Sequence, residues 1–274
     1  MERVVSEDGS TIAYQVSGKP SGSQAPALLL VHGTGGSYAR WEPVLPMLES
    51  CFQVYSMDRR GRNTYTEHQP YSIGAEYQDV VALVNHIHKT NAAGIYLLGH
   101  SFGGLCTLEA TLLTSLIDKL VLYEPPVCGL GVQVFPDDFM AKIDQLLQCD
   151  DREGVITAFL RDVVTLSSEE MELFRSSKKW GEEIAAAHTL PRELKEAVRY
   201  QFDERRFQSM RVPTLLLCGS HSPPFFKVAT DMIEEGLPVC RQQLLPGQQH
   251  VAMDTAPELF ARVVIDFLCQ AEDH

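Results

Sequence analysis

Short apolar runs alternate with longer helical patterns along most of this chain of 274 residues, and this alternation limits the fold more than any other feature. Turn residues bound each apolar run, as expected of strands that are buried on both faces of a sheet. Strand followed by helix, repeated, is typical of a doubly wound, mostly parallel α/β sheet. We expect strands at residues 27–31, 52–57, 94–98, 120–123, 214–218 and 241–245, and helices at residues 38–49, 75–88, 105–116 and 258–270.

Two segments depart from this alternation. At the start, Asp8-Gly9 between two β-prone runs predicts an opening hairpin. Residues 127–211 contain no clear strand and several helical patterns, at residues 138–148, 152–164, 168–175 and 191–206. We therefore expect an α/β core of residues 1–126 and 212–274, with a helical cap of residues 127–211. Such a cap would cover the carboxyl ends of the strands, where open α/β sheets bind ligands.

The composition argues against several classes of function. A net charge of −13 repels phosphate backbones and anionic lipids, so we expect no binding to nucleic acid or membrane. No apolar run is long enough to span a bilayer, and the first residues lack the apolar stretch of a signal peptide. The seven cysteines include no C-x-x-C pair, as in proteins with reduced thiols. These features predict a cytoplasmic protein that acts on a small molecule, and they leave a homodimer open.

The strongest single motif is Gly99-His100-Ser101-Phe102-Gly103. It follows an expected strand and precedes an expected helix, which is the setting of a nucleophile elbow. Its glycines permit a sharp turn that would lift the Ser101 hydroxyl above the sheet. The turn would also aim the backbone N–H of Phe102 at the reacting oxygen. The plainer alternative is a glycine-rich turn with an inert serine, and we expect His100 to pack rather than catalyse.

A serine nucleophile needs a base and donors that hold the oxyanion. Of nine histidines, His250 lies between the last expected strand and the final helix, where the base comes in this chain order. A solvated loop histidine is the alternative interpretation. The loop His32-Gly33-Thr34-Gly35-Gly36 follows the first core strand, and the backbone N–H of Thr34 is our candidate for the second donor. We expect His32 to orient this loop. The chain has no glycine-rich nucleotide loop and no clustered metal ligands, so we expect no cofactor and no metal.

These motifs together make a resemblance plain. The chain resembles the α/β-hydrolase superfamily with a cap, along essentially its whole length. The segments that carry the resemblance are His32-Gly33 after a strand, Asp58-x-x-Gly61, Gly99-x-Ser101-x-Gly103-Gly104 and Gly247-x-x-His250. Together they are specific for the fold and far less specific for the substrate.

The acid of the triad departs from the superfamily pattern. Relatives usually carry an aspartate just after the strand at residues 214–218, in a Gly-x-x-Asp pattern, but here Gly219-Ser220-His221-Ser222 ends in serine. Glu124 follows the neighbouring strand at the carboxyl end of the sheet, and its longer side chain could reach His250. Ser101, Glu124 and His250 then resemble the arrangement in fungal zearalenone lactonases. A turn cap or hinge ion pair is the alternative role for Glu124, and Asp58 is a weaker candidate for the acid.

The elbow serine argues against epoxide hydrolase and haloalkane dehalogenase chemistry, since those relatives carry aspartate there. Serine with a base and an oxyanion hole suits acyl transfer to water. We expect a serine esterase or lactonase for a small, mostly apolar substrate. The candidate substrate-binding residues are Tyr123, Phe225, Phe226 and Trp180. A carbon–carbon bond hydrolase on the same triad and a non-catalytic ligand receptor are the alternatives.

Overall fold

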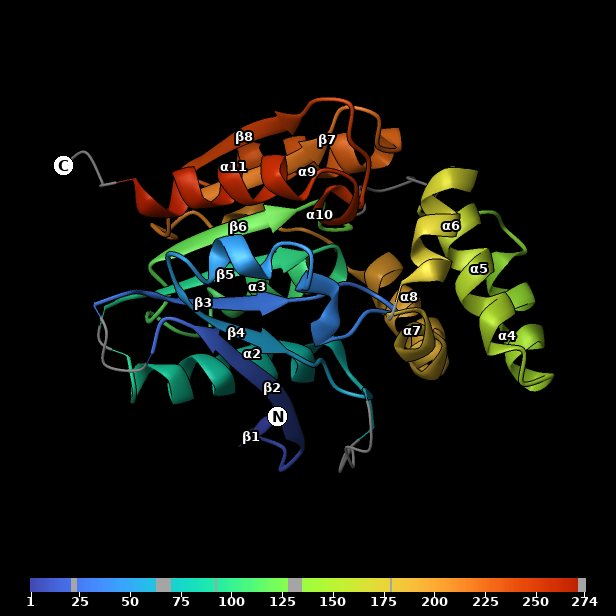
Figure 1. Cartoon of the computed structure of the whole chain (residues 1–274), viewed down its shortest axis with the longest axis horizontal. Helices are drawn as coiled ribbons and strands as arrows, with labels where there is room; N and C mark the ends of the chain where they lie inside the picture. Colours follow the sequence, from blue (N-terminus) through green and yellow to red (C-terminus); the bar gives the residue numbers. More distant parts are fainter. Residues whose placement is uncertain (21–23, 63–69, 92, 128–134, 178, 271–274) are drawn as a thin grey trace.

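A computed structural model describes residues 1–20, 24–62, 70–91, 93–127, 135–177 and 179–270. Its centre is an eight-stranded sheet with the strand order β1-β2-β4-β3-β5-β6-β7-β8 (Figure 1). The pairs β1–β2 and β2–β4 are antiparallel, and every other neighbouring pair is parallel. The predicted doubly wound, mostly parallel α/β sheet is therefore confirmed. The strands are β1 (Glu2–Val5), β2 (Thr11–Gly18), β3 (Ala27–Val31), β4 (Gln53–Met57), β5 (Ile95–His100), β6 (Lys119–Tyr123), β7 (Thr214–Gly219) and β8 (Cys240–Leu245).

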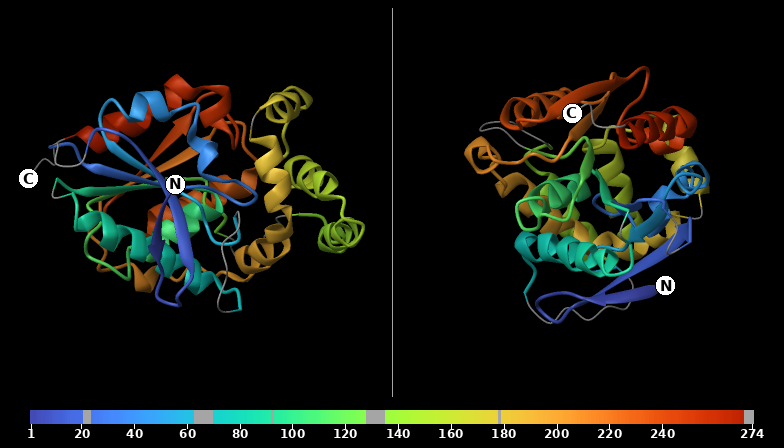
Figure 2. Two further views of the ribbon diagram at one scale, coloured as in Figure 1. Left: turned by 60° about the horizontal axis from the view of Figure 1, so that its bottom comes forward. Right: turned by 90° about the vertical axis from the view of Figure 1, so that its left-hand side faces the viewer.

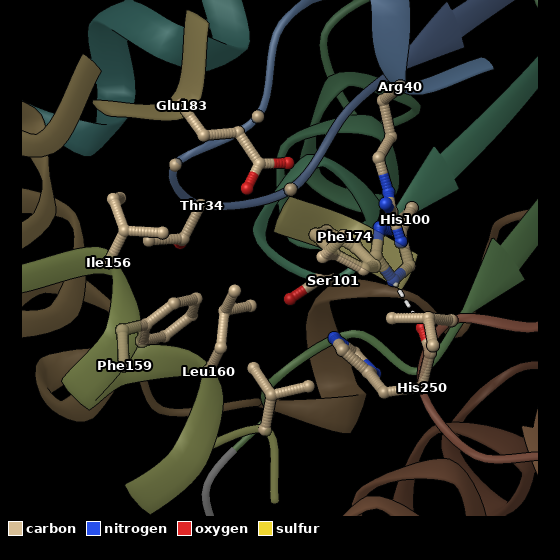
Figure 3. A pocket seen from close by; sticks show the side chains of 15 residues that line it. Thr34, Arg40, His100, Ser101, Ile156, Phe159, Leu160, Phe174, Glu183 and His250 are labelled. Atoms are coloured by element: carbon tan, nitrogen blue, oxygen red, sulfur yellow. Dashed lines mark hydrogen bonds between the residues drawn. The ribbon is translucent and has the colours of Figure 1, made fainter. Parts of the chain in front are cut away.

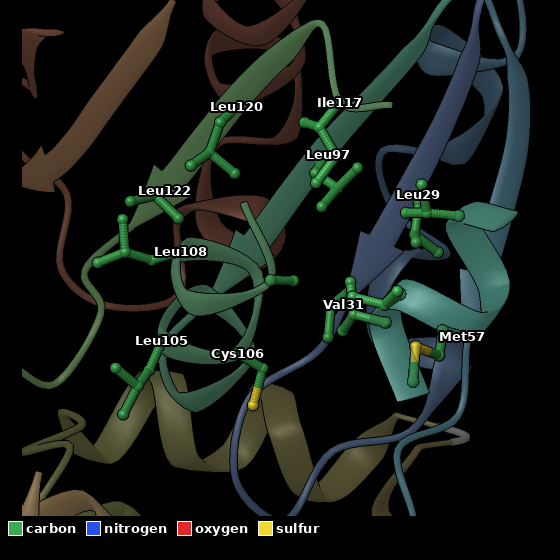
Figure 4. Packing of buried hydrophobic residues seen from close by; sticks show 14 of the residues in the cluster. Leu29, Val31, Met57, Leu97, Leu105, Cys106, Leu108, Ile117, Leu120 and Leu122 are labelled. Carbon is green, nitrogen blue, oxygen red and sulfur yellow. The ribbon is translucent and has the colours of Figure 1, made fainter. Parts of the chain in front are cut away.

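Helices cover both faces of the sheet, because its central strands carry apolar side chains in both directions. Leu29 and Leu97 belong to a cluster with α2, α3 and α9, which Figure 4 shows in part. Leu28 and Leu98, each one residue away, belong to a second cluster with α1, α10 and α11. The elements of these layers are η1 (Tyr38–Trp41), α1 (Leu45–Leu48), α2 (Ile73–His88), α3 (Phe102–Ala110), α9 (Pro224–Gly236), α10 (Ala252–Thr255) and α11 (Pro257–Cys269).

Between β6 and β7 the chain leaves the sheet and forms a group of helices beyond the carboxyl ends of the parallel strands (Figures 1 and 2). These helices share their own apolar cluster, which Val251 joins from the loop after β8. This is where the sequence predicts a cap, and we keep the division at residues 127 and 211 as a prediction. The elements are α4 (Phe139–Gln148), α5 (Arg152–Asp162), α6 (Ser168–Ser176), α7 (Trp180–Ala186), η2 (Ala187–Thr189), α8 (Leu190–Arg199) and η3 (Glu204–Arg206).

Three predicted helices differ in extent. Instead of one helix at residues 38–49 the chain forms η1 and α1, because Pro43 and Pro46 each lack the N–H that a continuous helix needs. The helix predicted at residues 105–116 begins at Phe102 and ends at Ala110, where the Thr111 hydroxyl donates to the Leu108 carbonyl. The helix predicted at residues 191–206 ends at Arg199, and η3 follows it separately. Helix α7 was not predicted.

Candidate active site

Ser101 lies in a strained turn at the carboxyl end of β5, directly before α3. Its φ of 52° is in the left-handed region, which is uncommon for a residue other than glycine. The turn is held from both sides, since the Ser101 N–H donates to the Tyr123 carbonyl at 2.9 Å and the Ser101 carbonyl accepts from Gly104 N at 2.8 Å. The tertiary structure therefore imposes the conformation of a nucleophile elbow on this serine.

Two glycines of the motif are required by close approach of other chain segments. A Cβ at Gly99 would lie 2.2 Å from Thr107 Oγ1, and a Cβ at Gly103 would lie 2.3 Å from the Val31 carbonyl oxygen. Both distances are shorter than real contacts, so no larger residue fits without displacing α3 or β3. This packing brings the first turn of α3 against the loop after β3.

Glu124 follows β6 and turns its side chain across β7. Its φ is 47°, its N–H donates to the Leu217 carbonyl, and its side chain is fully buried. One carboxylate oxygen, Oε1, accepts from the Gly219 N–H at 2.7 Å, and the other, Oε2, lies 2.5 Å from His250 Nδ1. The carboxylate of Glu124 thus reaches both the loop after β7 and the histidine, although it starts one strand away from that loop.

His250 is enclosed by aromatic rings and fixed through its backbone. The ring of Phe226 stacks on the imidazole with 4.2 Å between centroids, and His100 packs beside it at 4.5 Å. His100 Nε2 donates to the His250 carbonyl at 3.0 Å, and burial lowers the pKa of His100 well below its ordinary value. The predicted packing role of His100 is what the structure shows: a neutral ring that supports the loop of His250.

The loop after β3 is oriented by His32, as the sequence predicts. His32 Nδ1 donates to the Gly33 carbonyl at 2.9 Å, and its Nε2 accepts from the Arg59 backbone N–H at 3.1 Å. Accepting at Nε2 requires a neutral ring, which agrees with the strong lowering of the pKa of His32 by burial and by neighbouring arginines. Within the described residues, the backbone N–H groups of Thr34 and Phe102 donate to no protein acceptor. Both groups are therefore available to a ligand.

Two chambers meet at Ser101. Five residues line both of them: Thr34, Ser101, Phe159, Val164 and His250. The first, which we call the Glu183 chamber, is shown in Figure 3. The second, which we call the Phe225 chamber, lies on the other side of Ser101 and is lined by Phe225. The Glu183 chamber is also bounded by residues 33–36, Arg40, Ile156, Leu160, Phe174 and Glu183. The Phe225 chamber is also bounded by Pro126, Phe135, Val163, Leu194, Ala197, Val198, Phe225 and Phe226.

The structure divides the four predicted substrate-binding residues into two pairs. Phe225 and Phe226 line the Phe225 chamber. Tyr123 does not line either chamber: it is fully buried, and its hydroxyl donates to the Gln249 carbonyl and accepts from Ala252 N, so it supports the loop of His250 from below. Trp180 also lies outside both chambers, because it packs against the apolar cluster of the cap helices. The structure thus places both residues outside these two chambers.

Sequence reasoning missed Arg40 and Glu183, which bring charge into the Glu183 chamber. Neither belongs to a motif, and η1 and α7 are far apart in the chain. It also missed a buried ion-pair cluster behind the site, in which Glu193 of α8 contacts Arg59 at 3.2 Å and also pairs with Arg62. Asp58, the weaker candidate for the acid, accepts from the Tyr38 N–H at 2.8 Å instead of contacting His250.

Three features define a hydrolase of the α/β fold. They are the strand order of the sheet, the strained turn at Ser101 and the helices beyond the carboxyl edge of the sheet. The chain belongs to the alpha/beta hydrolase family, whose sequence model matches residues 28–263. It is 26% identical over 270 residues to the Agrobacterium fabrum protein named "Putative carbamate hydrolase RutD", over 94% of this chain and 98% of that one.

Solved structures agree with this membership. An alpha/beta hydrolase from Sphaerobacter thermophilus is similar with a TM-score of 0.80 and 27% identity, over 97% of this chain and 100% of that one. The esterase RhEst1 from Rhodococcus is similar with a TM-score of 0.77 and 24% identity, over 97% and 98% of the two chains, which is evidence for the fold alone. Among the residues that the structure describes, no helix is both long and apolar enough to cross a membrane.

Proposed function

We propose that this hydrolase cleaves a small, mostly apolar ester or lactone through an acyl-enzyme on Ser101. The observation that carries the proposal is the contact of 2.5 Å between Glu124 Oε2 and His250 Nδ1, in a site where Ser101 and His250 line the same two chambers. An ionised carboxylate only accepts hydrogen bonds, so Nδ1 carries the ring proton and Nε2 keeps its lone pair. His250 is then in the tautomer that a general base requires.

The reaction would proceed in two acyl transfers. Ser101 Oγ attacks the carbonyl carbon while His250 Nε2 takes the hydroxyl proton, and the backbone N–H groups of Thr34 and Phe102 hold the oxyanion. His250 then gives the proton to the leaving oxygen, and the bond from carbonyl carbon to leaving oxygen breaks. Water attacks the acyl-enzyme with His250 again as base, which releases the acid and restores Ser101. Glu124 stabilises the imidazolium in both steps.

The lining of the chambers supports the substrate class. The Phe225 chamber is bounded almost entirely by aromatic and aliphatic side chains, and the α5 side of the Glu183 chamber is apolar as well. Both chambers are narrow, which suits small molecules rather than polymers. Because the chambers meet at Ser101, one would hold the acyl group and the other the alcohol, or the two ends of a lactone ring.

Carbamate cleavage is a second candidate, because the relative RutD carries that activity in its name. The same nucleophile, base and oxyanion donors would serve, with a carbonyl that is bonded to nitrogen. Carbon–carbon bond hydrolysis and ligand reception without catalysis remain the alternatives that substrate trials would separate.

Two further expectations are kept as proposals. The described cysteines are all free thiols, which supports a reducing compartment, and we propose that the protein acts in the cytoplasm. Its proposed partner is a small-molecule substrate. A homodimer stays open, and the expectation that the chain binds neither nucleic acid nor membrane stays a prediction from its charge.

The test is hydrolysis of a short-chain chromogenic ester by wild type, Ser101→Ala and Glu124→Gln, with folding of each variant checked by circular dichroism. We expect Ser101→Ala to lower kcat by roughly 10⁴-fold or more and Glu124→Gln by roughly 10²–10⁴-fold. If only Ser101→Ala loses activity, the proposed serine hydrolase stands but Glu124 is not its acid. The same assay is repeated with lactones, and if wild type cleaves neither esters nor lactones, the proposed function is wrong.

A further inference from the structure

Two charged side chains line the Glu183 chamber and have no part in the hydrolysis described above. Arg40 comes from η1 of the core, and Glu183 comes from α7 of the cap helices. Figure 3 shows both beside the pocket that Ser101 and His250 also face. Charged groups in a small, largely apolar chamber are costly, so each needs a partner or a purpose.

Arg40 already has its partners. Its Nη1 lies 2.7 Å from Asp254 Oδ2, its Nη2 contacts Met253 Sδ at 3.3 Å, and its guanidinium covers the ring of Phe174. The other oxygen of Asp254 accepts from Lys179 Nζ at 2.6 Å. The charge of Arg40 is therefore balanced within the protein by that of Asp254.

Glu183 has no such partner. Only 6% of the residue is exposed, and its carboxyl forms no hydrogen bond or ion pair with any residue that the structure describes. Figure 3 shows the carboxyl group directed from α7 into the chamber, on the side of Thr34. A buried carboxyl without a partner destabilises the folded state. This cost is typically larger than the stabilisation that one hydrogen bond provides. Burial raises the pKa of Glu183 to about 7 despite the opposing charge of Arg40.

We propose that Glu183 is a specificity-determining residue that accepts a hydrogen bond from a neutral donor, a hydroxyl or an amide N–H, on the part of the substrate that enters this chamber. The proposal rests on the hydrolase function proposed for the same site. A substrate carboxylate would be repelled by Glu183. A substrate ammonium would have to give up its water in a chamber whose other walls are largely apolar, which is costly. A neutral donor satisfies the carboxyl without adding charge.

The test uses two matched pairs of esters, because either the acyl group or the alcohol could enter this chamber. One pair is p-nitrophenyl hexanoate and its terminally hydroxylated form, and the other is butyl butanoate and its terminally hydroxylated form. The quantity measured is the ratio of kcat/KM for the hydroxylated ester to kcat/KM for the plain ester. We expect Glu183→Leu to lower this ratio by about 10- to 100-fold in one pair at about pH 8.5, above the pKa of Glu183, because a hydrogen bond to a charged group is then lost.

Two variants make the result specific. Glu183→Gln keeps a neutral oxygen that accepts, so its ratio should lie between those of wild type and Glu183→Leu. Glu182→Gln changes the neighbouring carboxyl of α7, which lines neither chamber, and should leave the ratio unchanged. Glu183→Met, which also lacks an acceptor, replaces the leucine variant if that variant does not fold. The inference is overturned if the ratios of both pairs are the same in wild type and in the variants without an acceptor.

A failure of the hydrolase proposal is read separately. If wild type cleaves none of the four esters, their binding to Ser101→Ala is measured by titration calorimetry. Tighter binding of the hydroxylated form, lost in the double variant with Glu183→Leu, would support recognition by Glu183 even without turnover. Equal binding of plain and hydroxylated esters would overturn it.

Discussion

The two sides of the active site are held in place by different forces. On the core side, backbone hydrogen bonds that continue the sheet hold two residues of the proposed triad: Ser101 N–H donates to the Tyr123 carbonyl, and Glu124 N–H donates to the Leu217 carbonyl. On the cap side, buried ion pairs between side chains attach the helices to the core. These join Glu193 to two arginines and Lys179 to Asp254.

Because of this difference, the stability and selectivity of the enzyme can change independently of the rate of the chemical step. The backbone of adjacent parallel strands has one register, so the distance from Ser101 to the strand of Glu124 is set regardless of the side chains in the cap. Ion pairs between side chains depend on charge and pH, and one substitution removes them. Changes in the cap should therefore alter stability and selectivity, whereas changes at the sheet edge should alter the rate of the chemical step.

The largest effect in this comparison tests whether the acid can be moved from one strand end to the next. Glu124→Gln should lose roughly 10²–10⁴-fold in kcat, and adding Ser222→Asp should restore at least roughly tenfold of it. Position 222 lies in the loop after β7, which packs so closely on the loop of His250 that a Cβ at Gly219 would lie 2.4 Å from the Gln248 carbonyl oxygen. We therefore expect an aspartate at position 222 to interact with His250. If kcat does not recover in the double variant, a carboxylate at position 222 cannot replace Glu124.

The next effect concerns the attachment of the cap. Burial raises the pKa of Glu193, but the charges of Arg59 and Arg62 outweigh it and hold that pKa below its ordinary value. Glu193→Ala would leave these buried charges with fewer partners, and we expect it to lower the free energy of unfolding in urea by about 3–5 kcal/mol.

The matched control for Glu193 is Glu196→Ala on the same helix. It removes an ion pair with Arg199, whose side chain is 73% exposed, and should cost at most about 0.5 kcal/mol. Equal destabilisation by the two variants would contradict the view that buried pairs attach the cap.

The third effect is a pH dependence that comes from one buried carboxyl of the cap, that of Glu183. Burial raises the pKa of Glu183 from 4.5 to about 7, with Arg40 and Lys179 opposing the shift and Asp254 and Glu182 adding to it. The folded state therefore binds this proton more tightly, so the stabilisation is complete below about pH 4.5 and is lost as the pH rises through 7.

Relative to Glu183→Gln, wild type should lose about 3 kcal/mol of unfolding free energy between about pH 4 and about pH 8. Urea unfolding of both proteins across this range measures the difference. A constant difference between them would show that Glu183 does not titrate near neutrality.

The smallest effect separates the two chambers. Phe225 is half-buried and bounds only the chamber named after it, so Phe225→Ala should remove apolar contact with little loss of stability. We expect kcat/KM for a plain apolar ester to fall by about 3- to 30-fold, or about 1–2 kcal/mol. The preference for hydroxylated over plain esters, which we assign to the other chamber, should not change. If that preference falls as well, the two chambers do not act separately.

The sequence predicts the position of a residue well where that position depends on order along the chain. Ser101 and His250 stand in motifs next to strand ends, and strand ends of a parallel sheet meet at one edge, so the structure brings them to the same chambers. Glu124 was predicted as the acid because Ser222 stands where relatives carry an aspartate. The sequence could not decide the positions of Tyr123 and Trp180, because an aromatic residue beside a strand end or a helix end can face either the cleft or the core.

Local sequence patterns by themselves determined the alternation of strands and helices, the parallel sheet and the turn that carries Ser101. They could do so because apolar periodicity and glycine act over a few residues. Only the tertiary structure decided that Glu124 reaches His250 across a neighbouring strand, that Arg40 is paired with Asp254, and that Glu183 faces the site without a partner. These relations join elements that are distant in the chain, and burial and charge balance exist only after packing has brought them together.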